Sequence, residues 1–222
     1  MKINREMVTR AGLKVLNEEG LEQLTLRRLG IVLNVQAATI YWHFKSKDEL
    51  IDEMATTVLS EGAGKLMPAR KTSDWRIWAA TFGEGLRKTL LAYRDGARMV
   101  SGTRLTNDEH LKTTERIGAQ VVASGFSLRA TAVLLSTIYN YTLSFVMEEQ
   151  AVFPKPGERS PRYSIEERNA RLDPAEFPFH RQATSILFDR YDRRFREGLE
   201  LILNGATPQV TGPQSVRSKS MK

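Results

Sequence analysis

Apolar residues recur at intervals of three and four along most of the chain, which is the spacing of an amphipathic helix. In the first such segment, 4–20, Val8, Leu13 and Leu16 lie largely on one face, and Gly20 is a good helix terminator. No segment has the alternation of apolar and polar residues that is typical of a half-buried strand. The pattern therefore predicts an all-α protein.

A second and a third short helix are predicted within 24–47. Leu26 and Leu29 recur at helical spacing, and Asn34 tolerates the left-handed backbone conformation better than most residues. The small residues Ala37 and Ala38 then open the next helix. The segment predicts a helix, a tight turn and a helix, a unit whose second helix enters the major groove in DNA-binding proteins.

Further helices follow this unit. Ser46 and Glu49 have the spacing of a capping box, which starts a helix that runs to about Gly62. The remaining helices are predicted at 75–93, 107–123, 128–150, 177–189 and 192–204, with a short helical turn from 94. The helix at 128–150 is apolar around most of its circumference and should be buried on several sides, whereas the last helix has an apolar stripe that needs a partner.

The charge of the segment 24–47 is unbalanced. It contains four cationic side chains, Arg27, Arg28, Lys45 and Lys47, and no acidic one. An uncompensated basic face favours a polyanion such as DNA, because each neutralised phosphate releases condensed counterions. The formal net charge of +7 agrees with an anionic partner. A solvated helical hairpin has the same residue pattern, so the segment alone leaves that alternative open.

The pattern divides the chain into three parts. Residues 1–45 are expected to form a helix-turn-helix DNA-binding domain, and 46–205 a larger helical domain for effector binding and dimerisation. Within the larger domain, the proline-rich segment 150–176 lacks periodicity and is predicted to be a mobile loop. Residues 206–222 contain three cations and no acid, which predicts a disordered basic tail.

Composition excludes several classes of function. The chain has no cysteine, so it forms no disulfide and has no thiolate metal site or cysteine nucleophile. Its three histidines, His43, His110 and His180, lie in separate segments without the spacing of a metal site or a catalytic pair. We therefore expect no enzyme, no metal and no other cofactor. No apolar run approaches the ~20 residues of a transmembrane helix, which predicts a soluble cytoplasmic protein without membrane contact.

Several blocks of the sequence resemble the tetracycline-repressor family of bacterial transcription factors. LTLRRLGIVLNV and ATIYWHFKSKDELID look like the family's helix-turn-helix and the start of its connecting helix. LLAYRDGARMVSGTRLT, GFSLRA, TLSFVMEEQ and GLELILNG are similar to the inducer domain of its tetracycline-repressor branch. The resemblance covers roughly 4–205 and implies a homodimer that binds a palindromic double-stranded DNA operator and a small-molecule effector.

The resemblance also implies which residues contact DNA. The expected set is Thr25, Arg27, Arg28, Gln36, Ala37, Ala38, Thr39, Tyr41, Trp42, His43 and Lys47, of which Tyr41, His43 and Lys47 are the best candidates for phosphate contacts. Thr25 is expected to cap the helix that contains Arg27 and Arg28. Ala37 and Ala38 stand where the tetracycline repressor has glutamine and proline, so the operator sequence should differ.

The effector pocket implied by the resemblance departs from the tetracycline type. The histidine that holds the drug's magnesium corresponds to Val100, which offers no lone pair. The expected pocket residues are Phe82, Leu86, Val100, Thr103, Arg104, Leu105, Ile117, Tyr139, Asn140, Met147 and Glu148. Few polar groups in an apolar cavity suit a hydrophobic or aromatic molecule, so magnesium-tetracycline is not the expected effector.

Repression relieved by an effector is the expected mechanism. The helix predicted at 46–62 lies between the two domains, so a ligand that moves the loop 102–106 should shift this helix and change the spacing of the two recognition helices. Two other functions stay open: a ligand-independent DNA-binding or architectural protein, and a small helical enzyme.

Overall fold

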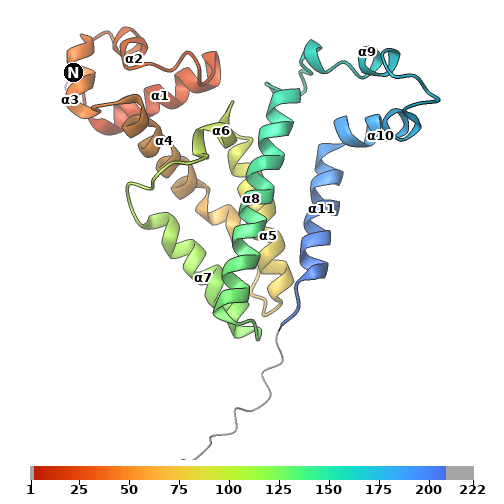
Figure 1. The fold of residues 1–222 in the computed structure, drawn as a ribbon. Helices are drawn as coiled ribbons and strands as arrows, with labels where there is room; N and C mark the ends of the chain where they lie inside the picture. The colour runs from red at the N-terminus through yellow and green to blue at the C-terminus, as the bar shows by residue number, and fades with distance from the viewer. Residues whose placement is uncertain (1–2, 209–222) are drawn as a thin grey trace, which may run out of the picture.

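The fold consists of eleven α-helices and two 3-10 turns within residues 3–208, the part of the chain that this computed structural model describes. An isolated β-bridge between Lys155 and Glu158 lies in the same part. The prediction of an all-α protein is confirmed. Three helices form one end of the molecule, and the larger group begins beyond α4 (Figure 1). The predicted tail, 206–222, falls outside the described residues except for 206–208.

The first three helices form the predicted helix-turn-helix domain. They are α1 (Arg5–Glu19), α2 (Leu26–Val32) and α3 (Ala37–His43). Thr25 begins α2 as predicted, because its hydroxyl oxygen accepts the N–H of Arg28 at 3.0 Å. Asn34 joins α2 to α3 in the left-handed conformation, with a φ of 53°. The turn is so tight that a Cβ at Gly30 would lie 3.0 Å from the carbonyl oxygen of Val35.

Helix α4 (Lys47–Gly62) leads from this domain into the rest of the molecule and continues as a 3-10 turn, Ala63–Leu66 (Figure 1). Its start has the predicted serine cap, since Ser46 Oγ accepts the N–H of Glu49 at 3.1 Å. The Glu49 carboxylate accepts the N–H of Lys45, at 2.7 Å, where a capping box would engage the serine N–H. α4 packs against α1 and also against α5, so it contacts both domains.

The larger domain is built around α5. Its principal helices are α5 (Trp75–Leu90), α6 (Gly96–Val100), α7 (Glu109–Ala123), α8 (Leu128–Val152), α10 (Pro178–Phe188) and α11 (Tyr191–Gly205). α5 lies against α7, α8 and α11. Gly83 permits this close approach, since a Cβ there would lie 3.0 Å from Ile138 and 3.1 Å from Leu199. The rings of Phe145 and Phe195, whose centroids are 5.2 Å apart, join α8 to α11.

Helix α8 is buried on fewer sides than the sequence predicts. Ile138 and Val146 are buried, but Leu128 is 79% exposed and Val133 is 56% exposed. On α11, Leu201 is 75% exposed. Among the described residues, α8 is the one helix long and apolar enough to cross a membrane, and the core helix of a soluble protein has the same properties. In the single chain, α8 and α11 therefore expose apolar side chains to solvent.

The segment 150–176, predicted to be a mobile loop, contains helical structure. α8 continues to Val152, and a 3-10 turn, Pro161–Tyr163, and a short helix, α9 (Ile165–Ala170), follow. Arg159 donates a hydrogen bond to the carbonyl oxygen of Phe188 at 2.6 Å, which ties the segment to α10. Charged side chains that bind backbone carbonyl groups leave no apolar periodicity, so the pattern missed this order. α9 and α10 project from the body as an arm (Figure 1).

Candidate nucleic-acid interface and effector region

Helix α3 presents most of its surface to solvent. Ile40 is its one buried residue, and it packs with the buried Phe44 beneath the helix. Trp42 is 81% exposed, and Tyr41 is exposed as well. Of the other expected contact residues, Gln36 and Ala38 are exposed, whereas Ala37, Thr39 and His43 are half-buried. An aromatic pair beside an amide and small methyl groups is a surface that reaches base edges and phosphates in a major groove.

The two arginines of α2 differ in their surroundings. Arg27 is exposed and forms no ion pair within residues 3–208. Arg28 instead binds the Glu19 carboxylate of α1 with two nitrogens: Nε lies 3.0 Å from both oxygens and Nη2 lies 2.6 Å from Oε1. This hydrogen bonding lowers the pKa of the Glu19 carboxyl below its usual range. The expectation of an uncompensated basic face is therefore wrong for Arg28, because its partner comes from outside the segment 24–47.

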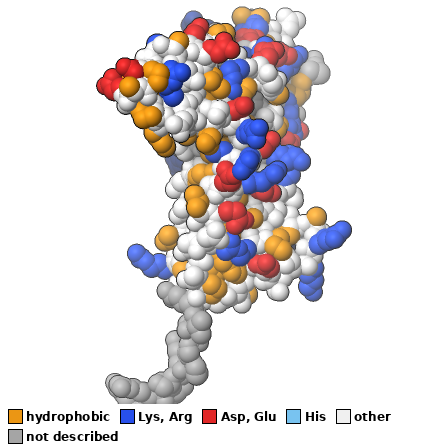
Figure 2. Space-filling view, turned by 90° about the vertical axis from the view of Figure 1, so that its right-hand side faces the viewer, with side chains coloured by type: hydrophobic (Ala, Val, Ile, Leu, Met, Phe, Trp, Pro, Cys, Tyr) orange, Lys and Arg blue, Asp and Glu red, His pale blue; other side chains and the backbone are white. Residues whose placement is uncertain are grey.

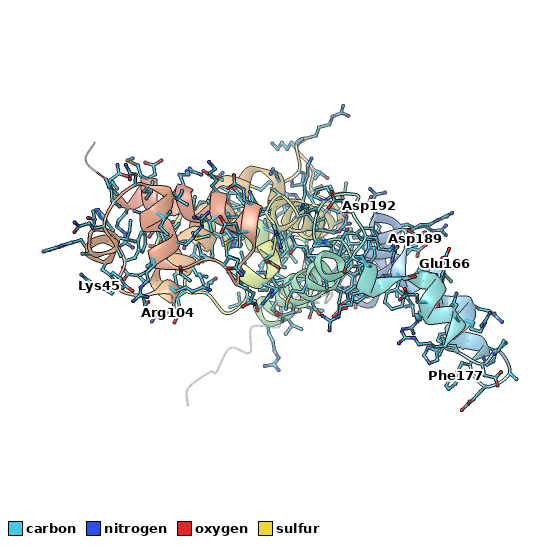
Figure 3. All side chains as sticks on the ribbon, turned by 90° about the horizontal axis from the view of Figure 1, so that it is seen from above. Lys45, Arg104, Glu166, Phe177, Asp189 and Asp192 are labelled. Atoms are coloured by element: carbon cyan, nitrogen blue, oxygen red, sulfur yellow. The ribbon has the colours of Figure 1, made fainter. Side chains whose placement is uncertain are left out.

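The two lysines at the start of α4 also have different roles. Lys47, an expected phosphate contact, is half-buried and donates from Nζ to the carbonyl oxygen of Leu21 at 2.9 Å, which ties α4 to the loop between α1 and α2. Lys45 is exposed beside α3, with Nζ 5.8 Å from the centroid of the Trp42 ring. Sequence reasoning omitted Lys45 from the contact set. Figure 3 shows Lys45 at the end of the molecule opposite to the arm that contains Phe177.

The expected effector residues fall into two groups. The core contains the buried Phe82, Leu86, Val100 and Ile117, and Thr103, Leu105 and Tyr139 are half-buried. The other four, Arg104, Asn140, Met147 and Glu148, are exposed, Met147 to 37%. Asn140 and Met147 are seven residues apart on α8 and lie on a face turned from the core of the single chain. The eleven residues therefore divide between the core and the surface of the single chain, and their role as one effector pocket stays a prediction.

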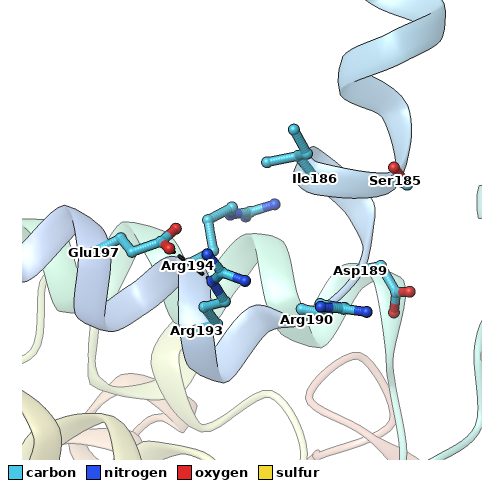
Figure 4. A pocket seen from close by; sticks show the side chains of 7 residues that line it. All are labelled: Ser185, Ile186, Asp189, Arg190, Arg193, Arg194 and Glu197. Atoms are coloured by element: carbon cyan, nitrogen blue, oxygen red, sulfur yellow. Dashed lines mark hydrogen bonds and ion pairs between the residues drawn. The ribbon is translucent and has the colours of Figure 1, made fainter.

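A cavity of about 440 Å³ lies elsewhere, at the junction of α10 and α11. Its lining is Ser185, Ile186, Asp189, Arg190, Arg193, Arg194 and Glu197 (Figure 4). Arg193 pairs with Glu197 at 2.7 Å, and the guanidinium of Arg194 lies over the Tyr191 ring. Figure 2 views this side of the molecule, where basic side chains gather near the middle of the face. The sequence analysis did not single out this cavity.

The loop between α6 and α7 is hydrogen-bonded to α4. Asp52 Oδ1 accepts the N–H of Arg104 at 2.8 Å, and Thr56 Oγ1 accepts the N–H of Thr106 at 2.9 Å. His110, at the start of α7, is buried against the same helix, and burial lowers its pKa. The loop that should respond to an effector is thus attached directly to the helix that carries the DNA-binding domain.

A second contact joins the two domains without α4. The carboxylate of Asp95 accepts the N–H of Leu21 at 2.9 Å, and Asn17 Oδ1 accepts the N–H of Arg94 at 2.9 Å. Asp95 adopts the left-handed conformation, with a φ of 54°. We call these contacts, between the end of α1 and the start of α6, the α1–α6 joint. No local pattern indicates this joint, because its partners are more than 70 residues apart in the chain.

A helix-turn-helix with an exposed recognition helix, coupled to a larger helical domain, defines a DNA-binding transcriptional regulator. Residues 8–54 match the family described as "Bacterial regulatory proteins, tetR family". Residues 67–210 match the family described as "Tetracyclin repressor-like, C-terminal domain". The chain therefore belongs to the tetR family of bacterial regulatory proteins, and it is a transcriptional repressor with a DNA-binding domain and a ligand-binding domain.

The similarity to individual relatives extends over nearly the whole chain. The chain is 35% identical to the tetracycline repressor protein class A from transposon 1721 of Escherichia coli, over 92% of this chain and 90% of the relative. A possible TetR family transcriptional regulator from Streptomyces coelicolor A3(2) is 29% identical with a TM-score of 0.80, covering 91% of this chain and 98% of that one. TetR(class A), solved with 5a,6-anhydrotetracycline and magnesium, is 29% identical with a TM-score of 0.65, covering 92% and 98%.

Proposed function

We propose that the protein is a cytoplasmic, homodimeric repressor that binds a palindromic operator and is released by a small hydrophobic or aromatic effector. The observation that carries the proposal is the pair of hydrogen bonds that Asp52 and Thr56 of α4 accept from the N–H groups of Arg104 and Thr106 in the loop between α6 and α7. They link the recognition domain to the region where an effector would bind. The family relationship supports a regulatory function, and we propose no enzymatic activity.

On the DNA side, α3 lies in the major groove. Tyr41 and Trp42 contact the sugar-phosphate backbone and the groove floor, and the methyl groups of Ala37 and Ala38 contact thymine methyl groups. Arg27 and Lys45 supply phosphate contacts, because both are exposed beside the recognition helix. Thr25, Gln36, Thr39, His43 and Lys47 complete the proposed surface, with Lys47 acting mainly through its bond to Leu21. Arg28 contributes after it exchanges Glu19 for a phosphate.

The dimer is proposed to form through α8 and α11. Both helices have exposed apolar side chains, including Leu128, Val133 and Leu201, that water contacts in the single chain. A two-fold axis through this surface would place two copies of α3 at the same side of the molecule. Each would bind one half of a palindrome, with the half-sites about one helical turn, ~34 Å, apart.

The effector is proposed to occupy the region bounded by Phe82, Leu86, Val100 and Ile117 and by the loop that contains Thr103 and Leu105. Val100 is buried, and a valine at this position offers the ligand apolar contact and no metal-binding lone pair. The described residues contain no group of three His, Cys, Asp or Glu side chains that could hold a metal ion. A hydrophobic or aromatic molecule without magnesium fits this chemistry better than magnesium-tetracycline does.

Release would follow from movement of the loop. An effector that displaces the loop between α6 and α7 pulls on α4 through Asp52 and Thr56 and changes the angle of the DNA-binding domain. Because the two half-sites have a fixed spacing, a shift of either α3 helix weakens operator binding. DNA and effector affinities are then coupled reciprocally.

Selection of bound sequences from a random duplex library tests the proposal, followed by a screen of hydrophobic compounds. The selected operator should be palindromic, and an effector should raise the melting temperature of the protein and release the operator. Trp42→Ala should weaken operator binding at least about tenfold, whereas Ile77→Ala, at another exposed apolar residue, should leave it unchanged. Selection of non-palindromic DNA, or a stabilising compound that never affects DNA binding, would refute the mechanism.

A further inference from the structure

A cavity of about 500 Å³ lies between the DNA-binding domain and the larger domain. Its walls are the end of α1, the link between α5 and α6, the last turns of α8 and the turn 153–157; they include Asn17, Tyr93, Arg94, Gln150, Phe153 and Lys155. This volume falls in the range of small-molecule sites. The cavity shares no residue with the proposed effector region, so it is a separate place for a ligand.

The wall formed by α8 is held in place by hydrogen bonds. Gln150 Nε2 donates to the carbonyl oxygen of Tyr93 at 2.7 Å, and its Oε1 accepts the N–H of Ala97 at 3.2 Å. Glu149 binds Arg87 through both carboxylate oxygens, at 2.6 and 2.9 Å, and both side chains are only 12% exposed. These groups have partners already, so they shape the cavity and do not compete for a ligand.

The charge inside the cavity is positive. Arg94 lines it, donates to the carbonyl oxygen of Glu18 at 3.2 Å and has no carboxylate within ion-pair distance among residues 3–208. Lys155 pairs with Glu158 at 3.7 Å in an exposed, weak contact. Glu149 is paired with Arg87, which also binds the exposed Asp192 at 2.7 Å. Among the residues that line the cavity, Arg94 is the cation without a carboxylate partner within residues 3–208. A carboxylate can bind a guanidinium with two parallel hydrogen bonds.

The remaining lining is largely apolar, and the guanidinium of Arg159 lies over the Phe153 ring, 4.8 Å from its centroid. Tyr93 and Phe153 stand in the wall with Leu91 and two prolines, and these side chains suit a planar ring system. We propose that this cavity binds an aromatic anion, an aryl carboxylate of one or two rings, with the carboxylate on Arg94. The proposal does not depend on the identity of the effector in the other region.

A ligand at this place acts on the α1–α6 joint. Arg94 and Asn17 both line the cavity, and the N–H of Arg94 is bonded to Asn17 Oδ1. The neighbouring bond from Leu21 to Asp95 belongs to the same joint. Occupancy therefore changes how the DNA-binding domain sits on the larger domain without passing through α4. The protein would respond to two chemically different signals.

Isothermal titration of the full-length dimer with 2-naphthoate tests the proposal, with the neutral 2-naphthamide as the matched ligand. Naphthoate should bind with a Kd below about 1 mM, and the amide at least about tenfold more weakly. Arg94→Gln removes the charge, and Ala92→Trp places a bulky side chain at an exposed lining position while keeping Arg94. Each should weaken naphthoate binding about tenfold or more. The controls are Arg98→Gln, which removes the ion pair of Arg98 with Glu22 beside the joint and outside the cavity, and Ala119→Trp, at an exposed position of α7.

Two cavity variants are used so that Ala92→Trp still tests the location of the binding site if Arg94→Gln fails to fold. Absence of binding to the wild type, or equal affinity for acid and amide, overturns the proposal. Affinity unchanged in both Arg94→Gln and Ala92→Trp overturns it too, since the probe then occupies another site such as the effector region. Amide exchange at Leu21 should change on saturation of the wild type, and an unchanged rate overturns the link to the joint.

Discussion

Thr56→Val should weaken both the fold and the coupling between the domains. Thr56 is fully buried on α4, where its Oγ1 donates to the Asp52 carbonyl oxygen at 2.7 Å and accepts the N–H of Thr106 at 2.9 Å. Valine has nearly the same shape, so packing changes little. The Asp52 carbonyl keeps its helical partner, but the N–H of Thr106 loses its acceptor in a partly buried place. An unsatisfied donor of this kind costs about 1–3 kcal/mol, which is the expected loss in free energy of unfolding.

Thr56→Ser is the matched control, because it keeps the hydroxyl and loses one methyl group. Urea unfolding at a fixed protomer concentration measures both variants, since the stability of a dimer depends on concentration. The serine variant should lose only what a single buried methyl contributes, about 0.5–1.5 kcal/mol. The valine variant should also need more effector for operator release, because the loop no longer pulls on α4 at this point. Equal unfolding curves for valine and wild type, or normal release, would refute the argument.

Three further predictions concern other parts of the molecule. Gly85→Ala places a Cβ 2.1 Å from the backbone oxygen of Lys65 and should destabilise the protein by about 1–3 kcal/mol in thermal melts. Gly64→Ala should change stability little, because a Cβ there has no atom within 4 Å, and equal melting temperatures for the two variants would contradict this. Burial lowers the folded-state pKa of His110, so below about pH 6.5 the unfolded state binds a proton that the folded state does not, and stability falls with falling pH. His110→Gln should reduce the loss between about pH 7.5 and 5.5 in urea titrations; the same pH dependence in both proteins argues against it. Lys45→Ala should lower the slope of log affinity against log salt by about one, and Lys71→Ala should not; equal slopes would remove Lys45 from the interface.

Sequence patterns predicted the features that depend on neighbouring residues. Ser46 acts as a cap and Asn34 as a turn residue through contacts within three or four positions, so their roles follow from local spacing. Helical periodicity located the principal helices for the same reason. The family resemblance, which extends across both domains, supplied what periodicity lacks, namely which helices face DNA and which face an effector.

Contacts between distant residues were not predictable in this way. The pair of Arg28 with Glu19 and the bond of Asp95 to Leu21 join different segments through charged side chains, which leave no periodic trace. The segment 150–176 makes similar contacts, such as that of Arg159 with Phe188. Burial along α8 was overestimated because an apolar composition does not show whether a side chain is covered within its own chain or stays exposed in the single chain.

In the proposed operator complex, the bond between Arg28 and Glu19 would give this repressor a means to discriminate between DNA sites. A guanidinium already held by two carboxylate oxygens offers little to a phosphate that passes at random, since exchange must break both contacts. Only a duplex seated with α3 in register presents a phosphate where the exchange is favourable. The arginine then adds to residence on the operator more than to the loose attraction that every stretch of chromosome exerts. A genome offers ~10⁶ or more competing sites. A cation that is paired within the free protein would therefore reduce binding to these sites more than binding to the operator, which raises the specificity ratio.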